Sequence, residues 1–431
     1  ENLTLGAPLI SFQNSSILDS RATATLDFID GNIAELTSNG QVTRYTRVRP
    51  GMGYSLELDI NLIHGKGTVD QEGKVLIDFS QANITVINGL EGLLAEVYQY
   101  FAIWLATNPV TYELGQLAME YLGSSLTPDN FIIRTQPAPG AKHRDSRNYG
   151  DGAVLLFVAT KNNAGSGTLP TDTYPWLMPD EYSSAILVSN RLVLEKHIKP
   201  TMDKILDKGS WGLARGPGSN DAWYLRASDD ATIRSGVIRV GSSLEGAAIW
   251  SGDYYTSWSQ KYESHADYIY SIKNAVIKGD GYAVKMQYDD QYKYTQKFAS
   301  FFNAETTGIP YFAWRSANIS TTISGSVLYR LNLSSSSESI GLSLEKNNTV
   351  VKNDFYSLVR EKYAHIARRM ENDIHNQVQL SNNILTAVPF KDINVFAINH
   401  ILFPEHNINH LESVYIPGDL VIFGNIVPAL T

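Results

Sequence analysis

Apolar and polar residues alternate along several stretches of this chain. In the clearest stretch the apolar positions are Tyr54, Leu56, Leu58, Ile60 and Leu62, and after a Gly-containing interval Val75, Ile77 and Phe79 continue the pattern. Strict alternation is typical of a β-strand that buries one face. We therefore predict that these two runs form one long antiparallel hairpin.

Two more hairpins follow from the same period. One has apolar positions after a Gly279-Asp280-Gly281 turn, and the other has two apolar runs that face each other across residues 334–339. The positions are Tyr282, Val284, Met286 and Tyr288 in the first, and Val327, Tyr329, Leu331, Leu333, Ile340, Leu342 and Leu344 in the second. Runs longer than the usual five or six residues favour large, curved antiparallel sheets with one buried face.

Helical period is confined to a few segments. The first predicted helix has an apolar face formed by Leu94, Val97, Phe101 and Trp104 and ends at Asn108-Pro109. The second has an apolar face formed by Leu194, Ile198, Met202 and Ile205, and Ser189 is its candidate N-cap. The longest runs from about Asn353 to Leu380, has no Gly or Pro, and repeats apolar residues from Val359 to Ile374 at helical spacing. As one helix it would span roughly 40 Å.

Long strands combined with long amphipathic helices predict an α+β fold of elongated form, in which each curved antiparallel sheet is wrapped around a long helix. A Pro- and Gly-containing stretch over residues 165–180 predicts the connection between two lobes. We accordingly expect an N-terminal lobe over residues 1–170 and a C-terminal lobe over 171–431. The polar stretch over residues 136–151 is expected to be a surface loop.

Near its end the chain has two short β-rich runs, Val414–Ile416 and Leu420–Phe423, separated by Pro417-Gly418-Asp419. A fixed proline φ followed by glycine predicts a type II turn. These residues are therefore expected to form a structural hairpin rather than a binding site.

Composition excludes several classes of protein. The formal charge is −9, with 35 basic and 44 acidic residues, which argues against a nucleic-acid-binding role. The chain has no cysteine, so it has no disulfide, thiolate metal ligand or cysteine nucleophile. No run is long and apolar enough for a transmembrane segment, and nothing near Glu1 resembles a signal peptide.

Candidate catalytic chemistry is sparse. His400, His406 and His410 lie near Glu405 and Glu412, but the intervening sequence favours a loop, so a solvated cluster is preferred to a metal site. Phosphate-binding and nucleophile-elbow motifs are missing from the sequence. We expect no catalytic residue, no metal and no cofactor, and hence no enzyme.

Basic residues gather in two places. Lys142, His143, Arg144 and Arg147 lie in the loop over residues 136–151, and Arg44, Arg47 and Arg49 lie together farther upstream. Basic side chains facing anionic lipid stabilise membrane association. Lys142, Arg144 and Arg147 are therefore candidates for contact with an anionic headgroup, with a simply solvated loop as the alternative.

Several motifs taken in order resemble one known family. They are "APLISF" (7–12), "DNFIIRT" (129–135), "GAVLLFVAT" (152–160), "YSSAILVSNRLVLEKHIKP" (182–200), "HILFPEHN" (400–407) and "PGDLVIFGN" (417–425). Together they resemble the clostridial P-forty-seven family, which is encoded beside botulinum-type neurotoxins in orfX-type gene clusters. Such proteins usually begin with a helix before the "APLISF"-like strand, and this chain does not show one.

The resemblance implies a tubular lipid-binding (TULIP) fold and a bacterial, toxin-associated protein that is secreted or released, with insecticidal or oral-toxin accessory roles. Two functions follow. In the first, the protein binds lipid or another apolar small molecule, with Leu194, Ile198, Met202 and Ile205 lining the groove. In the second, the same residues are ordinary core, and the protein is a structural partner of other proteins of the toxin cluster.

Overall fold

The computed structural model describes residues 3–63, 65–78, 83–88, 103, 111–117, 125–161, 171, 174–218, 222–246, 258–304, 311–334, 338–357, 364–404 and 409–427. The chain folds into two compact units. Unit 1 comprises Glu1–Ser184, Asn394–His410 and Asn425–Thr431, and unit 2 comprises Ala185–Ile393 and Leu411–Gly424. The predicted domains, residues 1–170 and 171–431, stay predictions, because the compactness of a unit does not test whether it folds independently.

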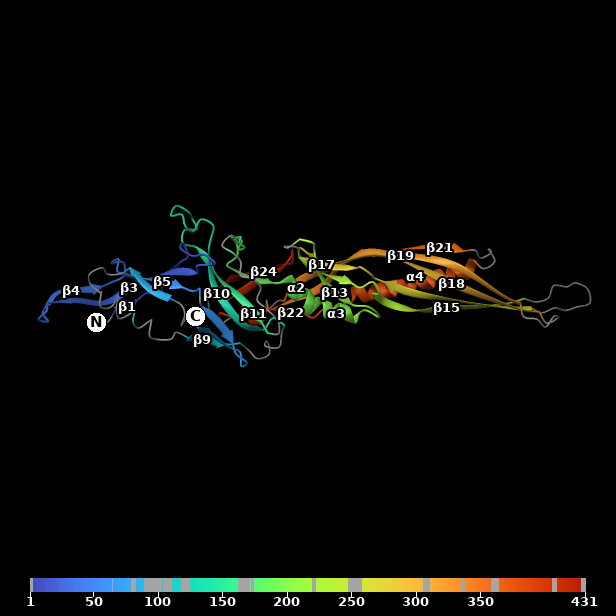
Figure 1. The fold of residues 1–431 in the computed structure, drawn as a ribbon, viewed down its shortest axis with the longest axis horizontal. Helices are drawn as coiled ribbons and strands as arrows, with labels where there is room; N and C mark the ends of the chain where they lie inside the picture. Colours follow the sequence, from blue (N-terminus) through green and yellow to red (C-terminus); the bar gives the residue numbers. More distant parts are fainter. Residues whose placement is uncertain are drawn as a thin grey trace, which may run out of the picture. The chain divides into compact units, whose positions relative to one another are not determined.

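Unit 1 contains two sheets (Figure 1). In the described residues one sheet has the order β1-β3-β5-β8, and β2 and β4 also pair with the long strand β3. The strands are β1 Leu3–Leu5, β2 Leu9–Ser11, β3 Arg21–Leu36, β4 Val42–Val48, β5 Ser55–Asn61 and β8 Asn83–Asn88. The second sheet has the order β11-β10-β6-β7-β9, with β6 Lys66–Val69, β7 Lys74–Asp78, β9 Thr111–Gln116, β10 Pro128–Pro137 and β11 Gly152–Thr160.

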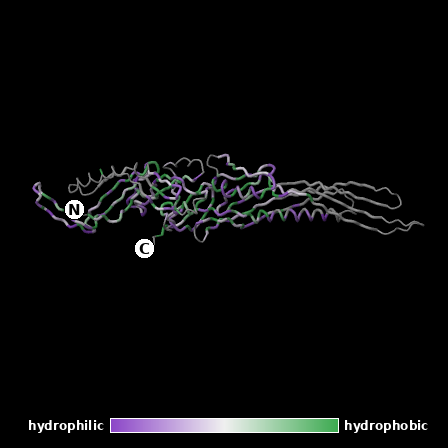
Figure 2. The backbone as a smooth tube through the Cα atoms, turned by 90° about the horizontal axis from the view of Figure 1, so that it is seen from below, coloured by the Kyte–Doolittle hydropathy of each residue, from purple (hydrophilic) through white to green (hydrophobic). Residues whose placement is uncertain are grey.

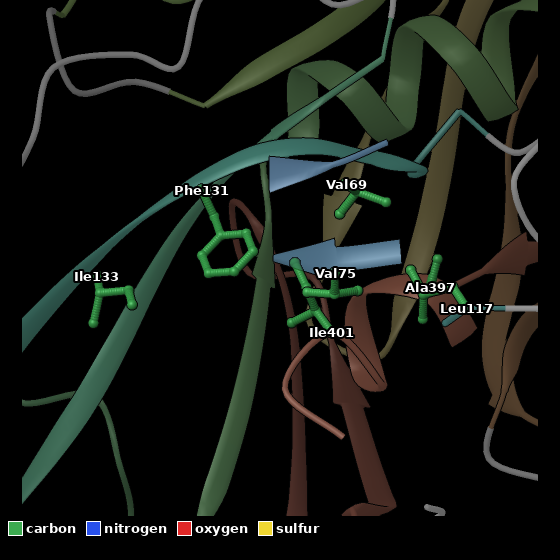
Figure 3. Close-up of a cluster of buried hydrophobic side chains, with 7 residues drawn as sticks. All are labelled: Val69, Val75, Leu117, Phe131, Ile133, Ala397 and Ile401. Carbon is green, nitrogen blue, oxygen red and sulfur yellow. The ribbon is translucent and has the colours of Figure 1, made fainter. Parts of the chain in front are cut away.

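A hydrophobic cluster fills the interior beside the second sheet of unit 1 (Figure 3). Its buried members are Val69, Val75, Leu117, Phe131, Ile133, Ala397 and Ile401. Gly67 is paired with Phe131, and a Cβ atom at Gly67 would lie 1.9 Å from the Phe131 ring. Glycine is therefore required here, because a side chain would displace the ring from the cluster.

Unit 2 is built around a ten-stranded sheet in the described residues. Its main path is β13-β14-β17-β18-β19-β20-β22, while β16 joins β15 to β18 and β21 pairs with β19. The bounds are β13 Trp211–Arg215, β14 Trp223–Ala227, β15 Thr232–Gly246, β16 Trp258–Ser271, β17 Val276–Asp280, β18 Ala283–Ala304, β19 Tyr311–Leu333, β20 Ser339–Asn347, β21 Val350–Ser357 and β22 Ile393–Asn394.

A three-stranded sheet of order β12-β24-β23 contains the closing hairpin of the chain. Its strands are β12 Ser184–Val188, β23 Asn409–Tyr415 and β24 Leu420–Ile426. Ile416, Leu420 and Ile422 are completely buried. The predicted structural hairpin is therefore confirmed.

The helices described in the structure are few. A continuous helical segment follows β12 and consists of α2 Asn190–Val193, the π-helical turn η2 Leu194–Ile198 and α3 Lys199–Lys204. The longest described helix is α4 Ala364–Thr386, with 23 residues, and α5 is Phe396–Asn399. Helix α4 packs against strands β15, β16, β19 and β21.

The α+β fold class with long antiparallel strands, which the pattern of hydrophobic residues predicted, is confirmed. Hydrophobic (green) and hydrophilic (purple) stretches alternate along the chain in Figure 2. The longest described strands are β18 with 22 residues and β19 with 23 residues. Across the loop at residues 334–339 the two predicted runs do pair, with Leu333 opposite Ile340 and Leu331 opposite Leu342. The second predicted hairpin is present, but its turn is displaced: Gly279 and Asp280 belong to β17, Asp280 pairs with Ala283, and the turn consists of Gly281 and Tyr282.

The predicted hairpin of residues 54–62 with 75–79 is wrong in its pairing. Strand β5 pairs with β3 and β8, whereas β7 pairs with β6 and β9 in the other sheet. Both runs are strands, but the chain changes sheets after Leu62 and inserts β6. Alternation identifies a half-buried strand and carries no information about its partner.

The predicted helix over residues 353–380 begins too early. Residues 350–357 form β21, which pairs with β19 from Ala317 to Ser324. Helical geometry is described only from Ala364, and it continues past Leu380 to Thr386. Pairing with a long neighbouring strand, which Phe355 and Tyr356 favour as aromatic residues, overrides the helical spacing of the sequence.

Two further predictions differ in outcome. Gly418 does not adopt the positive φ that a type II turn requires, so that turn type is wrong. The predicted helix over residues 94–104 lies outside the described residues, apart from Ile103.

Candidate ligand-binding site

The four residues predicted to line an apolar groove lie in the helical segment from α2 to α3, or directly after it. This segment packs on strands β13 and β14 of unit 2. Leu194 is 1% exposed, Ile198 and Met202 are 0% exposed, and Ile205 is partly buried. Leu194, Ile198 and Met202 belong to the core in this structure, and binding of a ligand among the four residues stays a prediction.

The start of this segment is held by a residue from the closing hairpin. Ser189 occupies the N-cap position, as predicted, but its side chain makes no capping hydrogen bond. Instead, the Asn190 backbone N–H donates to Asp419 Oδ1 at 2.8 Å. The Asn190 side chain donates to the Trp223 carbonyl at 2.9 Å and accepts from the Trp223 N–H at 3.3 Å. Sequence reasoning missed Asp419, because the two partners are 229 positions apart.

The segment is irregular in its middle. A π-helical turn covers Leu194–Ile198 and directly precedes Pro200, which lies near the start of α3. Proline has no N–H and its ring clashes with the carbonyl four residues earlier, so the wider π turn accommodates it without breaking the segment. Met202 remains fully buried after this irregularity.

Two titratable residues of the segment have defined surroundings. Asp203 forms an ion pair with Lys199 and accepts a hydrogen bond from the Trp211 N–H at 2.9 Å. His197 lies within the π-helical turn, where burial lowers its pKa to about 4. His197 is therefore neutral at physiological pH.

A second polar cluster lies where the end of α4 meets the sheet of unit 2. The Tyr329 hydroxyl donates to the Leu385 carbonyl, and the Tyr288 hydroxyl contacts the Thr349 hydroxyl, which contacts Asn382 Oδ1 at 3.0 Å. Burial raises the pKa of Tyr288 and of Tyr329, so both hydroxyls stay protonated.

Tyr270 belongs to the same region and is 0% exposed. Among the described residues its hydroxyl makes no hydrogen bond of normal geometry, although the Tyr288 hydroxyl lies close enough to raise the pKa of Tyr270 further, after burial. Buried donors of this kind are uncommon, and water or a ligand atom usually satisfies them. The sequence alone gives no sign of this buried hydroxyl, because its burial depends on which distant segments meet in space.

The predicted basic loop is compact and solvent-facing. Backbone hydrogen bonds join Ala138 to Asp151 and Gly150 to Ala141, each at 3.0 Å, and Phe12 donates to the Gly150 carbonyl at 2.8 Å. The candidate headgroup contacts Lys142, Arg144 and Arg147 are all exposed. Arg147 also lies 3.4 Å from the Asp180 carboxylate, a pair that is exposed and therefore weak. Contact with an anionic headgroup stays a prediction.

The histidine cluster is dispersed in the described part of the chain. His400 is buried, contacts the Phe396 carbonyl through Nδ1 at 3.0 Å and stacks on the Phe396 ring. His410 and Glu412 are exposed on β23, whereas Glu405 and His406 lie outside the described residues. Among the described residues, no group of three or more His, Asp or Glu side chains could hold a metal ion.

Comparisons with known proteins give limited guidance. No protein-family model and no curated protein matches the sequence. The structure is similar to a crystal structure of P47 of Clostridium botulinum E1. That comparison covers 99% of this chain and 93% of P47, with 8% identity and a TM-score of 0.49. A lipopolysaccharide binding protein is similar over 100% of this chain and 87% of its own, with 8% identity and a TM-score of 0.22.

Both TM-scores are below 0.5, so neither likeness assigns a fold or a function to this chain. In the described residues, the helices are too short or too polar to cross a membrane.

Proposed function

We propose that this protein binds lipid or another apolar molecule without chemical reaction, in a TULIP-like lobe formed by the ten-stranded sheet and α4. The observation that carries the proposal is that α4 contacts both β15 and β21. These strands are the two edges of the series β15-β16-β18-β19-β21.

Sheet geometry explains why these contacts matter. Four strand spacings separate β15 from β21, which amounts to roughly 19 Å in a flat sheet, whereas a helix is about 10 Å wide. Figure 1 shows α4 running along the strands rather than across them. Contact of such a helix with both edges supports a sheet that curls around it. Such a trough is the kind of enclosure that suits an elongated apolar ligand.

The exposed side of α4 is mostly polar, with Leu380 as an apolar exception, which fits a helix that turns its other side to the sheet. Arg368, Arg369, Asn372, Asn376 and Gln379 are all exposed. Within the same lobe, the buried Tyr270 hydroxyl, which makes no hydrogen bond of normal geometry among the described residues, offers a donor for a polar atom of the ligand.

Uptake of a fluorescent fatty-acid probe, together with native mass spectrometry of the purified protein, tests this function. We expect saturable uptake of about one probe per protein and co-purified apolar molecules that organic solvent extracts. Asn376→Pro should abolish uptake because proline breaks the middle of α4, at a cost of about 3 kcal/mol or more. Asn376→Ala is the matched control and should retain uptake. Absence of saturable uptake in the wild-type protein would refute the proposal.

A second function is supported by the complete burial of Leu194, Ile198 and Met202. If the interior of the lobe is filled in the same way, the protein is a structural partner of other proteins and needs no ligand. Association with toxin-cluster proteins, an insecticidal role and release outside the cell rest on the sequence resemblance and belong to this proposal. Native mass spectrometry with the products of neighbouring genes separates the two functions: a complex without bound lipid favours assembly.

A further inference from the structure

The ribbon formed by the outer part of β3 and by β4 carries apolar side chains on a solvent-facing side. Leu36 pairs with Val42, and Ala34 pairs with Tyr45. Leu36, Val42 and Tyr45 are 60%, 59% and 63% exposed. Val42 and Tyr45 are three positions apart, so simple alternation would place them on opposite sides of the strand. The β-bulge where the register shifts, between Glu35 and Leu36, brings both to the same side of the ribbon. We call Leu36, Val42 and Tyr45 the ribbon face.

Side chains on the opposite side of the ribbon make contacts within unit 1. Ile33 and Val48 are buried in a cluster with Phe28. Farther out on that side, Arg44 lies across from Glu35, with 3.5 Å between the guanidinium and the carboxylate. The ribbon is therefore attached to the sheet through one side, while the ribbon face lies in solvent.

Two arginines lie beside the ribbon face. Arg47 and Arg49 are exposed, and no ion pair is described for either of them within the part of the chain that the structure covers. From Asp30 to Arg49 the sequence holds three arginines and two acidic residues, and Arg44 lies on the opposite side of the ribbon beside Glu35. An apolar face flanked by arginines is thus a local exception on an acidic protein.

The exposed area of the ribbon face indicates which kind of partner it can bind. Three side chains of this kind expose only a few hundred square ångströms, whereas a stable protein interface buries about 800 Å² on each partner. Peripheral membrane binding needs less buried area. A few apolar side chains enter the interfacial region of the bilayer, and each nearby basic residue adds electrostatic attraction to anionic lipid.

We propose that the ribbon face, together with Arg47 and Arg49, docks this protein on membranes that contain anionic lipid. Leu36, Val42 and Tyr45 enter the interface between headgroups and acyl chains, and the arginines lie at the level of the phosphates. This proposal is independent of ligand uptake by the lobe around α4, and the two can fail separately.

Vesicle flotation tests the proposal with full-length protein. We expect binding to vesicles of phosphatidylcholine with about 30% phosphatidylserine, and at least tenfold weaker binding to pure phosphatidylcholine or at 0.5 M salt, because salt screens the charges. The variant Leu36→Ser/Val42→Ser/Tyr45→Ser should lose at least tenfold in affinity, and Arg47→Gln/Arg49→Gln about fivefold or more. Leu344→Ser/Val350→Ser, two exposed apolar positions of unit 2, is the matched control and should bind as wild type.

The lack of cysteine allows a second measurement that reports on position. Tyr45→Cys, labelled with an environment-sensitive fluorophore, should brighten and shift to shorter wavelength on addition of anionic vesicles, whereas labelled Leu344→Cys should not change. An unchanged signal at position 45, or equal binding by the triple serine variant, would overturn the proposal. Self-association that the triple variant abolishes, without vesicle binding, would overturn it in favour of a second copy of the chain.

Discussion

Met202 is the residue at which the two proposed functions differ most. A core residue with 0% exposure has no room for a larger side chain, so Met202→Trp should overpack the region between α3 and β13. We expect the free energy of unfolding to fall by about 1 to 3 kcal/mol in urea denaturation. Leu187→Trp, at a position that is 44% exposed, is the control and should stay within about 0.5 kcal/mol of wild type.

A different outcome at Met202 would be informative. If Met202→Trp is as stable as wild type and blocks uptake of the fatty-acid probe, the region opens in solution, and the four residues predicted from the sequence line the ligand site.

His197 links the stability of unit 2 to pH. Its pKa is about 4 in the folded protein, compared with about 6.5 in an unfolded chain. Above pH 6.5 the imidazole is neutral in both states. As pH falls from 6.5 towards 4, the unfolded state takes up a proton that the folded state does not, so stability falls, by up to about 3 kcal/mol.

Denaturation at several pH values checks this effect. His197→Gln should lose stability less steeply than wild type between pH 6.5 and pH 4, whereas His143→Gln in the exposed loop should keep the wild-type slope. Identical slopes for wild type and His197→Gln would show that His197 titrates normally.

The sequence predicted the roles of single residues less completely than it predicted the elements. The burial of Leu194, Ile198 and Met202 followed from helical spacing, and the exposure of Lys142, Arg144 and Arg147 followed from their polar loop. Neither the capping role of Asp419 nor the buried Tyr270 hydroxyl could be predicted. Both depend on which distant segments meet in space, and local periodicity carries no such information.

At the level of elements, the closing hairpin and the helical segment are joined by one hydrogen bond from Asn190 to Asp419. Asp419→Ala removes the acceptor for the first backbone N–H of α2, and helix N-cap substitutions of this type cost about 1 kcal/mol. We expect this loss in urea denaturation. Asp180→Ala, which removes only an exposed ion pair with Arg147, is the control and should change stability by less.

Elements were predicted best where pairing is local. The pairing of the two runs on either side of residues 334–339 was predicted correctly because one short turn separates them. The strand β5 was predicted as a strand but with the wrong partner, since its neighbours β3 and β8 are reached across intervening elements. The first part of the predicted helix at residues 353–380 is strand β21, because long-range pairing with β19 outweighs local spacing.

At the level of the whole molecule, the sequence predicts a protein without a metal centre. The histidines and acids near residue 400 have loop-type spacing, and the described residues contain no group of ligands that could hold a metal. We expect elemental analysis of dialysed protein to find zinc well below one equivalent. Stoichiometric zinc that is lost in His406→Ala would contradict this prediction.

The hydrogen bond between Asn190 and Asp419 also has a kinetic consequence. It closes a loop of 229 positions, for which the entropic cost is about 5 kcal/mol, so it cannot form early in folding. Until residues 411–424 are in place, β12 lacks its neighbour β24, and the segment that follows it is uncapped. We expect pulse-labelling hydrogen exchange to show protection of the Asn190 amide after that of β18, which pairs locally with β17 and β19. During that interval the start of the helical segment is less stable, and local opening there would expose apolar side chains that favour association with other unfolded chains.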